Sequence, residues 1–135
     1  MALPLSWINA EMAGAMLLDL SKLEQALAEF SRERDWDQFH TPKNLVMALT
    51  GEVGELNEIF QWLTDAEARE AGRSTATAVH VGEELADVLL YLVRLSSVLG
   101  VDLNAAVVDK LAKNALKYPA DKVRGSSRKA DPFAG

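Results

Sequence analysis

Two pairs of acidic residues in this chain have a spacing that could hold a metal ion. Glu52 and Glu55 are three residues apart, and Glu84 and Asp87 repeat that spacing. On a helix, residues three apart lie on one face with about 5–6 Å between their Cβ atoms, so each pair can direct two carboxylates at one point. If the two helices pack antiparallel, all four carboxylates converge. Their mutual repulsion then requires a cation or bound protons.

The residue types in this acidic set indicate a hard cation. The set offers oxygen ligands only, and the whole chain has no cysteine. Oxygen ligands suit Mg²⁺, or Mn²⁺ as a substitute, and argue against zinc. Because Mg²⁺ commonly takes further ligands from substrate phosphates, the pattern predicts phosphate-ester or anhydride chemistry. A di-iron carboxylate site is rejected, since neither His40 nor His80 follows a glutamate by three residues.

The alternative interpretation is that both acidic pairs face water, which is the usual fate of an isolated Glu-x-x-Glu pair. Asp87, however, opens the apolar run 88–93. A helix with apolar residues on nearly every side is expected to be buried, and its carboxylates then need a partner. Glu58 could extend the acidic face as an outer ligand or base. Glu83 is rotated by about 100° from Glu84 and is expected to be a surface charge.

Four segments of helical apolar periodicity position these residues, without a strand pattern. The first expected helix has apolar residues from Leu17 to Phe30 and ends near Arg34 or Asp35. The second covers residues 42–62 and the third covers residues 78–99. Asp102 caps the fourth, which runs through Lys117. Thr41 and Pro42 suit a helix start, and Gly100 suits a helix end. Gly51 and Gly54 suggest close packing of another helix against the second one. Residues 64–77 read as a linker.

The fold class that these segments predict is all-α, a four- to five-helix bundle. We expect one helical domain over residues 1–119 and a flexible tail over 120–135, in a chain with 49% apolar and 25% charged residues. The net charge of −6 argues against general binding of duplex nucleic acid. No segment has membrane-spanning length, and the apolar run 13–18 lacks a preceding basic region, so we interpret it as a helix rather than a signal peptide. The expected location is the cytoplasm.

Further motifs resemble those of the MazG-like all-α nucleoside triphosphate pyrophosphohydrolases, and most of all their dCTP pyrophosphatase branch. The resemblance runs from about Leu23 to Lys129. It is carried by the segments 36–40 (WDQFH), 42–44 (PKN), 51–56 (GEVGEL), 60–62 (FQW), 83–89 (EELADVL), 91–92 (YL), 101–103 (VDL) and 117–119 (KYP). What it implies is hydrolysis of a (deoxy)nucleoside triphosphate between its α- and β-phosphates, which gives the monophosphate and pyrophosphate.

The resemblance also implies residue roles and an assembly. Glu52, Glu55, Glu84 and Asp87 would be the Mg²⁺ ligands and the catalytic carboxylates. The substrate-binding residues would be Trp36, His40, Trp62, Tyr91, Lys110, Asn114, Lys117 and Tyr118. Core packing of the aromatic residues and a solvated basic helix face are the plainer alternatives. Members of this family assemble as dimers or tetramers with pockets walled by more than one subunit, and a homotetramer is our preferred expectation.

One position departs from the resemblance. Animal members of the branch carry a histidine where this chain has Leu27, so base specificity does not carry over directly. A broader house-cleaning nucleotide pyrophosphatase and a dUTP hydrolase therefore stay open as alternatives. A non-catalytic helical interaction module is the alternative from another functional class.

Overall fold

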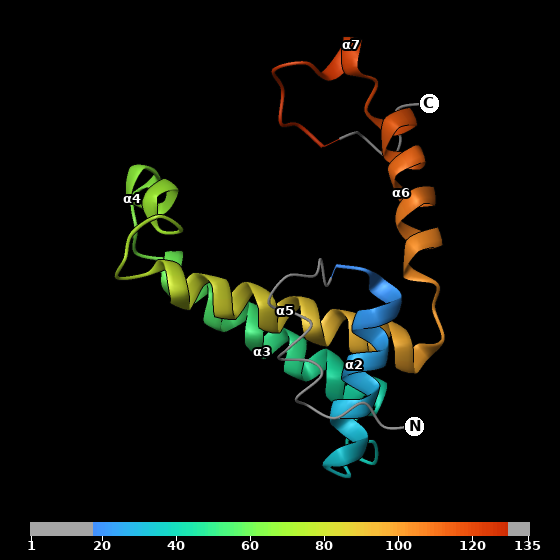
Figure 1. Ribbon diagram of the computed structural model, residues 1–135. Coiled ribbons are helices and arrows are strands. Elements are labelled where there is room, and N and C mark those ends of the chain that lie inside the picture. Colours follow the sequence, from blue (N-terminus) through green and yellow to red (C-terminus); the bar gives the residue numbers. More distant parts are fainter. Residues whose placement is uncertain (1–17, 130–135) are drawn as a thin grey trace. The chain divides into compact units, whose positions relative to one another are not determined.

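The computed structural model describes residues 18–129, which form helices without any strand (Figure 1). The expected all-α fold is confirmed. The chain divides into two units between Val101 and Asp102, and each unit is described by itself. Residues 13–17 of the apolar run interpreted as a helix lie outside the described residues. No helix within residues 18–129 is long and apolar enough to cross a membrane.

The helices of the first unit begin and end where local chemistry dictates. Helix α2 spans Leu20–Glu33, α3 spans Pro42–Phe60 and α5 spans Ala78–Leu99. The Thr41 side chain accepts a hydrogen bond from the Asn44 N–H at the start of α3. Gly100 ends α5 in the left-handed conformation, with φ of 66°. This conformation costs glycine no steric strain, and both sequence-predicted boundaries are confirmed.

Helices α3 and α5 run antiparallel along each other, and α2 packs across α5 (Figure 1). Leu45 of α3 and Val93 of α5 are the most deeply buried apolar side chains, at 2% and 1% exposure. Leu23 and Ala26 add the buried face of α2. The antiparallel pairing meets the condition under which the two acidic pairs can converge.

The segment 64–77 contains a helix that the sequence interpretation missed. Helix α4 spans Asp65–Glu70 and starts with a capping box. The Thr64 hydroxyl accepts from the Glu67 N–H at 3.3 Å, and the Glu67 carboxylate accepts from the Thr64 N–H at 2.9 Å. A threonine followed three residues later by glutamate is the sequence signature of this cap, so the interpretation as a linker is corrected.

The second unit contains α6, Leu103–Lys117, and the short α7, Ala120–Val123. The Asp102 side chain caps α6 by accepting a hydrogen bond from the Ala105 N–H at 3.0 Å. The predicted fourth helix is therefore confirmed. Helix α7 lies in the segment expected to form the tail, and the single domain over 1–119 stays a prediction.

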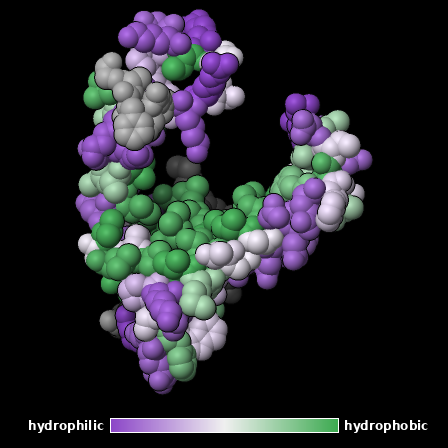
Figure 2. Space-filling view, turned by 180° about the vertical axis from the view of Figure 1, so that it is seen from behind, coloured by the Kyte–Doolittle hydropathy of each residue, from purple (hydrophilic) through white to green (hydrophobic). Residues whose placement is uncertain are grey.

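Much apolar surface of the α3–α5 pair is exposed in the single chain. Figure 2 shows hydrophobic side chains gathered along the central part of one face. The exposed members on these two helices include Val46, Met47, Val53, Val79, Leu85 and Leu92. A Cβ atom added at Gly51 or Gly54 would meet nothing within 4 Å. Within the described chain no helix packs closely against these glycines, so that expectation is wrong for the single chain.

Candidate metal centre and adjoining pocket

Three carboxylates converge between α3 and α5. Glu52, Glu55 and Glu84 each bring a carboxylate oxygen within 4.8 Å of the other two. Helical spacing puts the first two on one face of α3, and the antiparallel α5 supplies the third. Glu84 is buried, Glu52 is half-buried and Glu55 is exposed. The cluster is therefore open on the Glu55 side, where a ligand can enter.

The surroundings of this cluster disfavour negative charge in the absence of a cation. Burial raises the pKa of Glu52, and the charges of Glu55 and Asp87 raise it further. Burial and the charge of Glu55 likewise raise the pKa of Glu84. Carboxylates in such positions take up protons or share a bound cation.

Two atoms of the cluster show that a metal ion would fit here. The Oε2 atoms of Glu52 and Glu84 are buried, and neither has a hydrogen-bond partner among residues 18–129. Buried carboxylate oxygens without partners are costly. A cation would satisfy both, and a set made only of carboxylates suits a hard cation. The cluster can thus hold a metal ion.

His80 is a neighbour of the cluster that the sequence interpretation gave no role. Its Nε2 lies 3.3 Å from Oε1 of Glu84. Glu84 follows His80 by about one helical turn of α5. The charge of His80 lowers the pKa of Glu84 and so opposes the other influences. The spacing of four residues between His80 and Glu84 could have indicated this contact from the sequence.

Asp87 connects the cluster to a neighbouring pocket. It lies outside the set of oxygens within 4.8 Å, but its charge raises the pKa of both Glu52 and Glu84. Its side chain also lines the pocket. Glu58 and Glu83 are both exposed and contribute no oxygen to the cluster. Glu83 is thus the surface charge that was expected.

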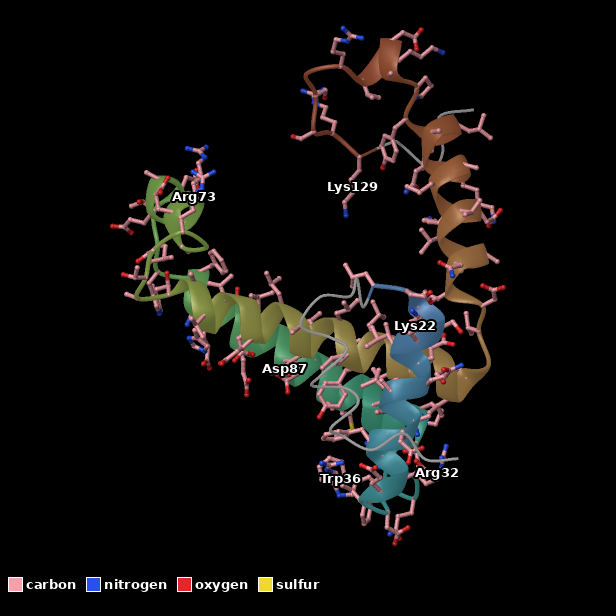
Figure 3. All side chains as sticks on the ribbon, in the orientation of Figure 1. Lys22, Arg32, Trp36, Arg73, Asp87 and Lys129 are labelled. Carbon is pink, nitrogen blue, oxygen red and sulfur yellow. The ribbon has the colours of Figure 1, made fainter. Side chains whose placement is uncertain are left out.

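The pocket is an open cavity of about 200 Å³ between α2, the following loop and α5. Trp36, a predicted pocket residue, lies on the loop after α2, and Asp87, which was predicted as a metal ligand, lies on α5 (Figure 3). Spacings of three and four residues put the α5 contribution on one helical stripe. The complete lining is Leu27 and Phe30 of α2, Trp36 and His40 of the loop, and Asp87, Leu90, Tyr91 and Arg94 of α5.

The loop after α2 is folded so that Trp36 and His40 reach the pocket. Asp35 adopts the left-handed conformation with φ of 54°, which aspartate tolerates better than most residues. The chain then turns, and the Trp36 N–H donates to the Ser31 carbonyl at 2.9 Å. The Trp36 ring packs edge-on against Phe30 with centroids 5.9 Å apart, and its centroid is 6.4 Å from that of His40. Trp36 stays 44% exposed, so its ring is accessible to a ligand.

A polar network supports the His40 side of the pocket. Arg94 donates from Nε to Nδ1 of His40 at 3.0 Å and from a terminal nitrogen to Oδ1 of Asp37 at 3.0 Å. Ser31 donates to the same Asp37 oxygen at 2.6 Å. Burial and the positive charge of Arg94 lower the pKa of His40, while Asp37 raises it.

Arg94 and the apolar wall residues are the pocket members that the sequence interpretation missed. Arg94 directly follows the apolar run 88–93. Its position seven residues after Asp87, two helical turns along one face, was the signal that could have found it. Leu27 was noted as a departure from the family pattern, and it does line the pocket.

The remaining predicted substrate residues lie elsewhere. Trp62 follows the end of α3 and is 86% exposed, outside the pocket lining. The other four belong to the second unit, which is described separately: Lys110, Asn114 and Lys117 on α6, followed by Tyr118. Lys117 and Tyr118 contact each other, with Nζ 5.6 Å from the ring centroid. Their roles toward a substrate stay predictions.

Comparisons with known proteins identify relatives of this chain. The MazG-like family model matches residues 48–132. The chain is 51% identical to human dCTP pyrophosphatase 1 over 110 residues, and 46% identical to the mouse protein of that name. Each match covers 82% of this chain and 65% of the relative, so the chain spans about two thirds of their length. A crystal structure of a pyrophosphatase from Archaeoglobus fulgidus is similar with a TM-score of 0.70 and 40% identity, over 78% of this chain and 96% of that one.

Proposed function

The chain belongs to the MazG-like family, and we propose that it hydrolyses (deoxy)nucleoside triphosphates between the α- and β-phosphates. The products are the nucleoside monophosphate and pyrophosphate, and dCTP-like substrates are favoured. The relatives named dCTP pyrophosphatase 1 support that preference. The observation that carries the proposal is the position of Asp87. Its side chain lines the aromatic pocket, and its charge raises the pKa of Glu52 in the carboxylate cluster.

We propose that Glu52, Glu55, Glu84 and Asp87 hold Mg²⁺, with Mn²⁺ as a substitute. The unpartnered Oε2 atoms of Glu52 and Glu84 support this assignment. When bound, Mg²⁺ supplies charge neutralisation of the phosphates and activation of a water molecule. One carboxylate of the cluster accepts the proton of the attacking water. The water oxygen bonds to one of the two phosphorus atoms that flank the α–β bridge. The bond from that phosphorus to the bridging oxygen breaks, so the monophosphate and pyrophosphate separate.

The pocket next to Asp87 receives the base and sugar in this proposal. Trp36 and Tyr91 offer ring faces on which a nucleobase can stack. His40 offers a polar contact on the same side. Lys110, Asn114, Lys117 and Tyr118 are proposed to contact the triphosphate, because a basic stripe complements its charge.

A homo-oligomer, preferably a tetramer, is part of the proposal. The exposed apolar side chains of α3 and α5 support it, because contiguous exposed apolar surface marks interaction sites. In such an assembly Trp62 would reach the pocket of a neighbouring subunit. The expected cytoplasmic location, and the absence of duplex nucleic acid or membrane partners, stay predictions.

A second candidate is a broader house-cleaning pyrophosphatase. Leu27 favours it, because an apolar side chain lines the pocket where the animal branch members carry histidine. Fewer polar contacts to the base would weaken the discrimination between bases. The turnover screen described below also tests a preference for dUTP.

The test is a turnover screen of all canonical dNTPs and NTPs with Mg²⁺ and analysis of the products. We expect pyrophosphate and the monophosphate, with dCTP among the best substrates. Glu55→Gln and Asp87→Asn should abolish turnover, whereas Glu58→Gln, on the same helix and outside the cluster, should retain it. Release of orthophosphate would refute cleavage between the α- and β-phosphates. Turnover that survives both cluster variants would favour a different site, and no turnover at all would favour a non-catalytic interaction module.

A further inference from the structure

We propose that Arg94 is a positioning residue that fixes His40 as the neutral tautomer with its proton on Nε2. His40 then donates a hydrogen bond to an acceptor on the group bound in the pocket. The identity of that group rests on the proposed function, and the tautomer does not. The carboxylate cluster does not use the His40 side chain.

The direction of the hydrogen bond between Arg94 and His40 fixes the tautomer. Arg94 Nε lies 3.0 Å from Nδ1 of His40. Arginine stays protonated in proteins, and every nitrogen of its guanidinium is a donor only. Nδ1 of His40 must therefore be the acceptor. A neutral imidazole has one donor and one acceptor nitrogen, so the proton lies on Nε2.

Ser31 is the other neighbour of Nδ1 and leaves this nitrogen as the acceptor. The Ser31 hydroxyl lies 3.2 Å from Nδ1 of His40 and could in principle accept from it. A proton on Nδ1 would, however, face the Nε–H of Arg94. The hydroxyl hydrogen is directed to Asp37 Oδ1 at 2.6 Å, where the partner is a carboxylate. Asp37 accepts from Arg94 as well, at 3.0 Å, so both neighbours of Nδ1 are held by one carboxylate.

Arg94 is held in place and favours the neutral form of His40. The Arg94 side chain is only 11% exposed and is paired with Asp37. Its positive charge beside Nδ1 disfavours a second proton on the ring, in agreement with the lowered pKa of His40. A mostly enclosed guanidinium in a fixed geometry therefore keeps the imidazole neutral and oriented, as outer partners do for other functional histidines.

The neutral His40 ring supplies the pocket with a hydrogen-bond donor. His40 lines the pocket, and Nε2 has no hydrogen-bond partner among residues 18–129. The pocket thus offers an N–H donor near the ring faces of Trp36 and Tyr91. A matching ligand is a planar ring that carries an acceptor, such as the carbonyl oxygen of a pyrimidine. A site built around a donor rejects rings that present a donor there, because a buried polar group would be left unpaired.

The test is a long-range ¹H–¹⁵N correlation spectrum of the uniformly ¹⁵N-labelled full chain at neutral pH. The chain has only two histidines, and a His80→Gln variant assigns their signals. We expect the His40 pattern of a neutral ring protonated at Nε2. A ring protonated at Nδ1, or an imidazolium at neutral pH, would overturn the proposal without any variant being needed.

Variants then assign the effect to Arg94. In Arg94→Met the His40 signals should move toward a mixture of tautomers, whereas Arg73→Met, which alters an exposed arginine paired with Glu70, should leave them unchanged. Unchanged His40 signals in Arg94→Met would refute the positioning role. Titration with dCMP should shift the Nε2–H signal of the wild type. A dCMP-bound protein whose Nε2–H signal does not move would refute donation to the ligand, and loss of turnover alone would not.

Discussion

Glu52 of α3 and Glu84 of α5 each have one carboxylate oxygen that no other residue among 18–129 satisfies. The Oε2 atom of each is buried without a hydrogen-bond partner among residues 18–129, although Glu55 lies between them as a shared neighbour. Burial is the largest cause that raises the pKa of both carboxyls. The α3–α5 pair therefore carries local instability at the cluster, and a cation would relieve it.

Replacing one of these glutamates by glutamine should stabilise the metal-free protein. A raised pKa means that the carboxyl favours folding below its unfolded value of 4.5 and that this contribution is lost as pH rises through the folded pKa. At neutral pH the charged carboxylate therefore destabilises the folded state, and Glu84→Gln or Glu52→Gln removes this charge. We expect each to raise the Tm in a chelator, and to lose the Tm increase that Mg²⁺ gives the wild type. Thermal unfolding with EDTA and with Mg²⁺ measures both effects.

Glu83→Gln provides the matched control for this experiment. Glu83 adjoins Glu84 on α5 but is exposed and outside the cluster. Its variant should keep the wild-type response to Mg²⁺. If Glu84→Gln kept that response as well, the cluster would not be the metal site.

The parts of the fold that the sequence predicted are those governed by local chemistry. Thr41, Pro42 and Gly100 bound helices through their own backbone and side-chain preferences, and the structure places the helix ends there. Helix α4 has an equally local cause in the Thr64 capping box, but a polar segment rich in small residues concealed it. The miss was thus one of recognition, because the signal was present.

The candidate site was only partly predictable, for a different reason. Spacing of three residues placed Glu52 beside Glu55, since a helix alone fixes that geometry. The contact between Arg94 and His40 spans 54 residues along the chain, and no local pattern fixes it. Leu90 and Phe30 likewise became pocket residues only through the packing of α2 across α5.

Trp36 should contribute most of the affinity for the base. Its ring is 44% exposed at the pocket, and stacking on an aromatic ring contributes about 1–3 kcal/mol per base. Trp36→Ala should therefore raise the KM for dCTP by roughly 5- to 150-fold, with a smaller change in kcat. Phe39→Ala is the matched control, because Phe39 is an exposed aromatic residue of the same loop outside the pocket lining. Equal losses in both variants would point to a disturbed loop instead.

Trp62 should act in the pocket of a neighbouring subunit. It is 86% exposed and does not line the pocket of its own chain. We expect Trp62→Ala and Glu55→Gln to be poorly active alone but to regain activity when the two chains are co-assembled. Mixed oligomers would then contain pockets with an intact cluster and an intact tryptophan. Light scattering checks that both variants still assemble, and co-assembly without recovered activity would contradict the shared pocket.

Arg94 and Asp37 should move the pKa of His40 in opposite directions. The groups that face the His40 ring are Arg94 of α5, Asp37 of the loop and Ser31 of α2, and Asp87 lines the same pocket. The positive charge of Arg94 lowers the pKa of His40 and Asp37 raises it, while burial lowers it most. Arg94→Met should therefore raise this pKa, and Asp37→Asn should lower it further. An NMR titration of the His40 ring protons measures both shifts.

The same charges set how His40 contributes to stability as pH changes. Because its folded pKa lies below the ordinary value of 6.5, the neutral ring favours folding above about pH 6.5. That contribution is lost as pH falls through the folded pKa. Arg94→Met should reduce this pH dependence of stability, because it brings the folded and unfolded pKa values of His40 closer together.

Asp35→Asn is the control for the titration of His40. Asp35 lies in the same loop but accepts a hydrogen bond from Gln38, so this variant should leave the His40 titration unchanged. Shifts of the same sign in Arg94→Met and Asp37→Asn would mean that neither charge acts directly on the ring.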